Sequence, residues 1–251
     1  MLHESFIILG GYLAFFAWRD LGLHPLVSLV GIAALMFAIG WGLQWGLINR
    51  IIARPVLTTL TLTFGLDMIV YNFMTLAFTA TPRRVALDLG VLNISDVVVP
   101  VDRIVAMVLA FALTGLLFLV LRSSTLGRAI VAVRMDRDAA ALMGIRVDRI
   151  YAITFGLGAL MAGACGSLLA VVYPVTTMMA DQFLGKAFVV CVIGGLGSVP
   201  GALAGGLALG LIESVSGHLV GPQHAMTIGF SLMILLLMTR PTGLLGTQGY
   251  E

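Results

Sequence analysis

Six apolar blocks separated by short polar segments constrain the fold of this chain more than any other feature, although the first is short for a full crossing. They cover residues 6–18, 26–48, 56–78, 104–121, 150–172 and 183–238. A helix needs about 20 apolar residues to cross a bilayer. The last block is long enough for three passes, with breaks at 194–201 and 216–223. We therefore predict an all-α integral membrane protein: a polytopic helical bundle of about 7–8 transmembrane segments, with broken, glycine-rich helices, forming one domain over 1–251.

Composition excludes several classes of protein. The chain is 60% apolar and 10% charged, whereas soluble domains average about 45–50% and about 25%. A soluble enzyme and a disordered chain are therefore excluded. The net charge of +2 is too small to favour a polyanionic partner. We expect membrane lipid around the chain and no nucleic acid.

The only lysine, Lys186, excludes one type of nucleotide site. A P-loop requires a glycine-rich loop that ends in Gly-Lys-Ser/Thr, but Ala187 follows Lys186. If ATP drives this protein, another chain must hydrolyse it. The chain is therefore not expected to be an enzyme.

Cysteine and histidine residues give no sign of a cofactor. Cys165 and Cys191 each lie inside an apolar stretch and are expected to be small buried hydrophobic residues. The histidines show no spacing typical of metal ligands, so we expect no metal and no catalytic residues. The four histidines are His3, His24, His218 and His224.

The arginines predict the orientation of the chain. The segment 122–149 is the most charged in the protein, and short arginine-rich loops favour the cytoplasmic side. Alternating crossings place one group of residues on that side: Arg50, Arg54, Arg122, Arg128, Arg134, Arg137, Arg146, Arg149 and Arg240. The opposite side receives Arg19, Arg83, Arg84, Arg103 and Lys186.

Two acids, Asp67 and Glu213, lie inside apolar blocks. A carboxylate at membrane depth should face the bundle interior or water. Both are therefore candidates for the substrate path, with a structural hydrogen bond or a position near the membrane interface as the alternatives. Neither has a basic or histidine partner spaced like a proton relay. This weakens an ion-coupled carrier but leaves it open, because backbone carbonyls can form sodium sites.

Glycines recur every four residues at Gly197, Gly201 and Gly205, and again at Gly206 and Gly210. On a helix they let a neighbouring helix approach closely. The alternative is a thin wall or broken helix beside a transport path. Pro200, within the first stripe, favours a break there.

The segment 136–144 predicts a short helix. Asp136 is a plausible N-cap and Asp138 lies in the first turn. Ala139 and Ala140 have high helix propensity and little bulk, and Gly144 suits a left-handed C-terminal cap. Such a helix either fits a groove on a partner or is an ordinary connector.

This helix also carries a family resemblance. Asp138-Ala139-Ala140 followed by Gly144 resembles the E-A-A-x-x-x-G loop of ABC importer permeases, with Asp for Glu. Three other stretches are similar to branched-chain amino acid permeases of the LivH type, so the resemblance covers nearly the whole chain. They are His3-Glu4 with 9–14, similar to H-G-E-F-x-x-L-G-A-Y; the glycine-rich 186–202; and the tail 240–246.

Three departures accompany the resemblance. The family has a further transmembrane helix before the His-Gly-Glu segment, so we expect either a start inside a longer reading frame or a truncation. Ser5 and Ile7 differ from the family's pattern in that segment. Asp67 stands where such permeases usually carry an uncharged residue, which favours an altered substrate preference.

The resemblance implies a permease subunit of an ABC importer in the bacterial cytoplasmic membrane, working by alternating access. Implied partners are a second, LivM-like permease subunit, two ATP-binding subunits and an extracytoplasmic solute-binding protein. Asp138, Ala139, Ala140 and Gly144 would couple to the ATPase. The substrate would be a branched-chain or related amino acid, with urea, short amides and aromatic acids left open. The alternative functions are an ion-coupled secondary transporter of a small polar solute and a membrane-embedded enzyme, for which no catalytic cluster is found.

Overall fold

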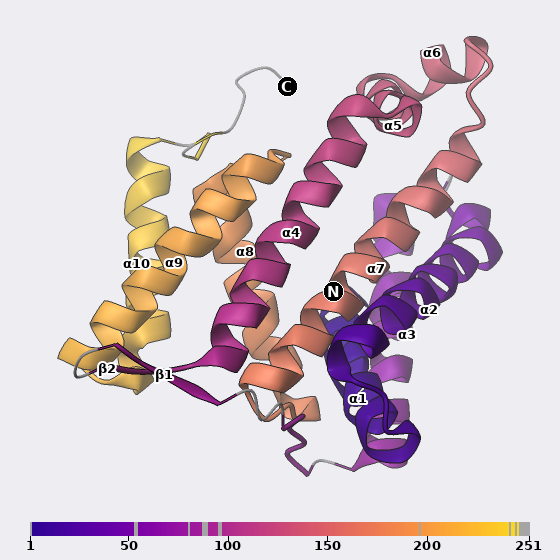
Figure 1. The fold of residues 1–251 in the computed structure, drawn as a ribbon. Helices are drawn as coiled ribbons and strands as arrows, with labels where there is room; N and C mark the ends of the chain where they lie inside the picture. Colours follow the sequence, from indigo (N-terminus) through magenta and orange to yellow (C-terminus); the bar gives the residue numbers. More distant parts are fainter. Residues whose placement is uncertain are drawn as a thin grey trace. The chain divides into compact units, whose positions relative to one another are not determined.

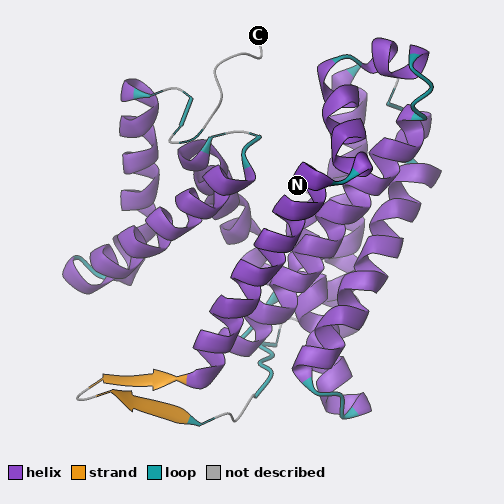
Figure 2. Cartoon of the chain, turned by 45° about the horizontal axis from the view of Figure 1, so that its top comes forward, coloured by secondary structure: helices purple, strands orange, loops and turns teal. Residues whose placement is uncertain are grey.

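The computed structural model describes residues 2–52, 55–79, 81–86, 90–94, 97–195, 197–240, 242, 243 and 245. Helices dominate, as Figure 1 shows. They are α1 (Leu2–Leu21), α2 (Pro25–Gly46), α3 (Val56–Phe78), α4 (Val101–Ser123), α5 (Thr125–Met135), α6 (Arg137–Leu142), α7 (Val147–Val172), α8 (Ala180–Gly194), α9 (Val199–Leu219) and α10 (Pro222–Thr239), with the 3-10 helices η1 (Ile48–Arg50) and η2 (Thr177–Met179). Strands β1 (Val91–Ile94) and β2 (Val97–Pro100) form an antiparallel pair, with Val91 opposite Pro100 (Figure 2).

Seven helical segments in the described ranges are long and apolar enough to cross a membrane. They are Pro25–Arg50, Leu57–Phe78, Val101–Ser123, Val147–Val172, Thr177–Gly194, Val199–Leu219 and Pro222–Thr239. The prediction of an all-α, polytopic membrane protein is confirmed, and the last apolar block does supply three of the spans. The chain divides into two compact units, Met1–Ala180 and Asp181–Glu251.

In the first unit, α7 is the central helix. It packs against α1, α2 and α4 (Figure 1). Small residues make these contacts possible: a Cβ atom added at Gly10 would overlap the backbone of Gly163, and one at Gly166 would overlap the carbonyl of Ile7. Such backbone-to-backbone contact is typical of membrane helices, where packing rather than hydrophobic burial favours association.

The two ends of the first unit carry different arginines. At one end, the Arg83 backbone N–H donates to the Val175 carbonyl at 3.0 Å. The guanidinium groups of Arg19 and Arg83 both lie over the Phe15 ring there. At the other end, the Asn49 side-chain amide donates to the Asp148 carbonyl at 3.0 Å, beside α5 and α6. Within this unit, the arginines expected on opposite sides therefore lie toward opposite ends. Arg54 lies outside the described residues, and Lys186 and Arg240 belong to the other unit.

The second unit packs α8, α9 and α10 around a small apolar core. Val189, Ile193, Leu209 and Met233 form its buried cluster. The chain turns between Gly194 and Val199, so the helical region is interrupted there.

The glycines of the second unit have different environments. Gly197 lies in the turn with φ +86°, not on the helical stripe. Gly201 and Gly205 lie on α9 against Gly194 of α8. Ser198 caps α9 by accepting from the Gly201 N–H at 3.1 Å, and Pro200 occupies its first turn, where its missing N–H is not needed.

The expectation of buried cysteines is wrong. Cys165 and Cys191 are both exposed on the surface of this chain. Lipid is as apolar as a protein core, so an apolar sequence context does not distinguish the two surroundings. Among the described residues, no three His, Cys, Asp or Glu side chains gather as metal ligands would.

Candidate functional site

The N-terminus of α6 is capped as its sequence predicts. The Asp136 carboxylate accepts hydrogen bonds from the backbone N–H groups of Asp138 and Ala139, each at 2.9 Å. Two of the amides that a helix start leaves without partners are thereby satisfied. This confirms Asp136 as the N-cap.

The C-terminus of α6 ends in a left-handed turn at Gly144, with φ +83°. The Gly144 N–H donates to the Ala141 carbonyl at 3.0 Å, and the Ile145 N–H donates to the Ala140 carbonyl at 3.1 Å. These two bonds make a Schellman motif. The predicted glycine cap is confirmed, and a helix of only six residues is closed at both ends.

The outward face of α6 is not the alanine face that its composition suggests. Ala140 is 4% exposed and packs with Val133 of α5 and Val147 of α7. Leu142 and Met143 are instead 89% and 83% exposed. Consecutive alanines carry no periodicity, so the sequence alone could not tell which of them faces inward. Asp138, Ala139 and Gly144 are exposed.

Asp67 connects two helices of the first unit. It lies on α3, and its Oδ1 atom accepts a hydrogen bond from Ser5 Oγ of α1 at 2.5 Å. Ser5 is 1% exposed, and the neighbouring Glu4 is also buried. The first turn of α1 therefore brings a polar cluster into an apolar bundle.

Glu213 has a basic partner, contrary to the expectation from sequence. The Lys186 ammonium on α8 donates to Glu213 Oε2 on α9 at 2.9 Å. The two residues are 27 positions apart, and only the antiparallel packing of the two helices brings them together. Lys186 itself lies within α8, inside the last apolar block. Asp67 and Glu213 belong to different compact units.

The sequence analysis did not predict a group of buried polar atoms near Tyr12. The buried Tyr12 hydroxyl donates to the Thr79 carbonyl at 3.3 Å. Close by, Arg83 Nε and Thr177 Oγ1 are buried without a hydrogen-bond partner in the described part of the chain. The Pro-Arg-Arg sequence at 82–84 was the only signal, and it indicated charge without indicating burial.

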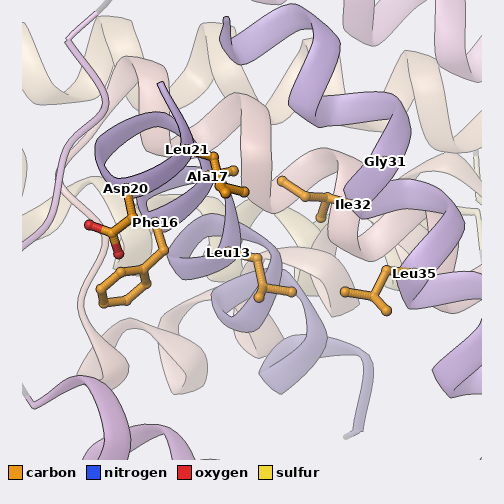
Figure 3. Close-up of a pocket in the computed structure, with 8 residues that line it drawn as sticks. All are labelled: Leu13, Phe16, Ala17, Asp20, Leu21, Gly31, Ile32 and Leu35. Carbon is orange, nitrogen blue, oxygen red and sulfur yellow. The ribbon is translucent and has the colours of Figure 1, made fainter. Parts of the chain in front are cut away.

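A groove of about 350 Å³ lies between α1 and α2 (Figure 3). Its lining is Leu13, Phe16, Ala17, Asp20, Leu21, Gly31, Ile32 and Leu35. The one carboxylate in this lining, Asp20, is paired with Arg19 at 2.6 Å. The groove is therefore suited to an apolar chain and not to a charged solute.

Comparison with known proteins decides the class of this bundle. Residues 3–239 match the model of a family described as branched-chain amino acid transport system / permease component. The chain belongs to this family. It is 31% identical to the high-affinity branched-chain amino acid transport system permease protein BraD of Pseudomonas aeruginosa and 33% identical to LivH of Salmonella typhimurium. It is 31% identical to LivH of Escherichia coli K12.

Each of these alignments covers 99% of the chain and 86% of the relative. No solved structure matches the chain. The family membership confirms the prediction of a permease subunit of an ABC importer, a transport component without its own ATPase motif. It also confirms a multi-pass membrane protein.

Proposed function

We propose that this permease subunit translocates branched-chain or related amino acids across the bacterial cytoplasmic membrane. The observation that carries the proposal is the family match over residues 3–239, together with relatives named for branched-chain amino acid transport. The working complex would contain a second, LivM-like permease subunit, two ATP-binding subunits and an extracytoplasmic solute-binding protein. Transport would follow alternating access.

The segment 136–144 is the proposed contact with an ATP-binding subunit. Leu142 and Met143 are almost fully exposed beside the exposed Arg137 and Arg146. Two large apolar side chains with a charged rim are typical of a protein interface. The rigid caps at Asp136 and Gly144 would transmit the motion of the ATPase to α5 and α7.

Asp67 and Glu213 are the proposed polar contacts of the translocation path. Each is an acid within a spanning helix and each already has a hydrogen-bond partner. The break near Pro200 and the close helix contacts at Gly201 and Gly205 would allow α8 and α9 to move against each other.

Reconstitution tests the function. The chain is co-expressed with the ATP-binding subunits and the second permease subunit and placed in proteoliposomes with the binding protein outside. We expect leucine uptake that requires ATP inside and persists when ion gradients are collapsed. Uptake by this chain alone, abolished by collapse of an ion gradient, would instead establish the secondary transporter.

A double substitution tests the ATPase contact. Leu142→Ser with Met143→Ser should reduce co-purification of the ATP-binding subunits at least threefold, since exposed apolar anchors dominate such interfaces. Leu92→Ser in β1 is the matched control, because Leu92 is exposed at the opposite end of the same unit. Full co-purification by the double variant would show that α6 is only a connector.

A further inference from the structure

The Lys186–Glu213 ion pair lies well inside two spanning helices. Lys186 is six residues from the start of α8, and Glu213 is six residues from the end of α9. At 1.5 Å per residue, both lie about 9 Å from the ends remote from the turn that joins the helices. Their side chains are 39% and 25% exposed on the surface of the chain. Charged groups at membrane depth face a protein interior or a water-filled cavity, because contact with lipid is expensive. This surface is therefore not a lipid surface.

The exposed apolar side chains of α9 lie on the side of the helix away from Glu213. Leu207, Leu211 and Val215 are exposed and follow one another at four-residue intervals. With 3.6 residues per turn, their centre is rotated by roughly 160° from Glu213. One side of α9 is therefore suited to contact with lipid, and the Lys186–Glu213 ion pair lies nearly opposite that side.

The surface beside the ion pair is polar and carries few bulky side chains. Three glycines lie on the same side of α9 as Glu213, at helical spacings from it. They are Gly206, seven residues before Glu213, Gly210, three residues before it, and Gly217, four residues after it. A Cβ atom added at Gly210 would meet nothing within 4 Å. On α8, the exposed Gln182 lies one turn from Lys186. Bare backbone and an amide therefore border the charges.

We propose that this face of α8 and α9 is a wall of the water-filled path, and that the Lys186–Glu213 pair opens to receive the zwitterionic head of the amino acid. The substrate carboxylate binds the Lys186 ammonium, and the substrate ammonium binds the Glu213 carboxylate. The exchange replaces one charge-assisted pair with two, so neither protein charge is left unpaired within the membrane. The identity of the substrate rests on the proposed function; the location of the path does not.

The accessibility of introduced thiols tests whether this face of α8 and α9 lines a water-filled path. In a Cys165→Ala, Cys191→Ala background, Gly210→Cys is compared with Leu211→Cys, its neighbour on the apolar side. Each assembled complex is treated with a charged, membrane-impermeant thiol reagent from either side, with and without ATP. Gly210→Cys should react at least tenfold faster than Leu211→Cys, at a rate that ATP changes. Equal reaction of the two cysteines, or no reaction at Gly210→Cys from either side, would overturn the proposal. Absence of reaction would indicate that another subunit covers this face.

Charge substitutions test recognition. Lys186→Gln with Glu213→Gln should reduce uptake per assembled complex at least tenfold. The exchange Lys186→Glu with Glu213→Lys keeps a bridge between the helices but reverses its polarity, so it should not restore uptake. Wild-type uptake by either double variant would show that the pair is only structural.

The two failures are distinguishable. A wild-type complex without amino acid uptake would refute the proposed function, whereas the thiol comparison would still report on the path. A transporting wild-type complex with an unreactive Gly210→Cys would refute only the inference.

Discussion

A single hydrogen bond joins Ser5 of α1 to Asp67 of α3. Ser5 is buried, so its hydroxyl depends on this acceptor; a buried donor without a partner costs about 1–3 kcal/mol. At the scale of a residue, the bond therefore has a structural role that is separable from the charge of the carboxylate.

Two substitutions at Asp67 separate the structural role from transport. Asp67→Asn keeps an acceptor oxygen and removes the charge, so we expect normal abundance with reduced uptake. Asp67→Leu removes the acceptor as well and should lower abundance. Immunoblots of membranes and uptake assays measure the two quantities, with Ser5→Ala as the control for the hydrogen bond. Normal uptake by Asp67→Asn would exclude a transport role for the charge.

At the scale of an element, α6 depends on its caps, because six residues are too few for a stable isolated helix. Gly144→Val places a β-branched residue at φ +83°. This strain should destabilise the turn by about 1–2 kcal/mol. Gly144→Asn is the matched control, since asparagine tolerates this conformation. Limited proteolysis of the assembled complex should show faster cleavage near 136–146 for Gly144→Val only; equal rates would refute the cap's importance.

The start of α4 is held by another contact between elements. Arg84 donates to Asp102 at 3.2 Å, and Asp102 is buried while Arg84 is half-exposed. Arg84→Gln should cost more than the about 0.2–1 kcal/mol of an exposed pair and less than the about 3–5 kcal/mol of a buried one. Thermal unfolding in detergent measures this, with Arg103→Gln as the control because Arg103 is exposed on the same helix. Equal melting temperatures for the Arg84→Gln and Arg103→Gln variants would contradict this prediction.

At the scale of the whole molecule, the two ends of the first unit should lie on opposite sides of the membrane. Asp88, in the polar segment expected on the extracytoplasmic side, lies outside the described residues, whereas Leu92 in β1 is exposed. In the cysteine-free background, Leu92→Cys should label from outside intact cells. Arg137→Cys, at the first residue of α6, should label only after the membrane is opened. The reverse pattern would invert the predicted orientation.

The sequence by itself determined the class of the protein and several local structures. Apolar blocks of spanning length leave few alternatives in a bilayer, because every backbone amide must be satisfied within a helix. The caps at Asp136 and Gly144 were likewise predictable, since capping depends on residues only a few positions apart.

Tertiary structure decided which side chains meet. The partnership of Lys186 with Glu213 and the burial of Ala140 depend on the packing of separate helices, and no local pattern encodes either. The exposure of Cys165 was also undetermined, because lipid and protein interior favour the same apolar residues. Periodicity predicts that a helix crosses the membrane; only packing decides which of its faces meets protein, lipid or the solute path.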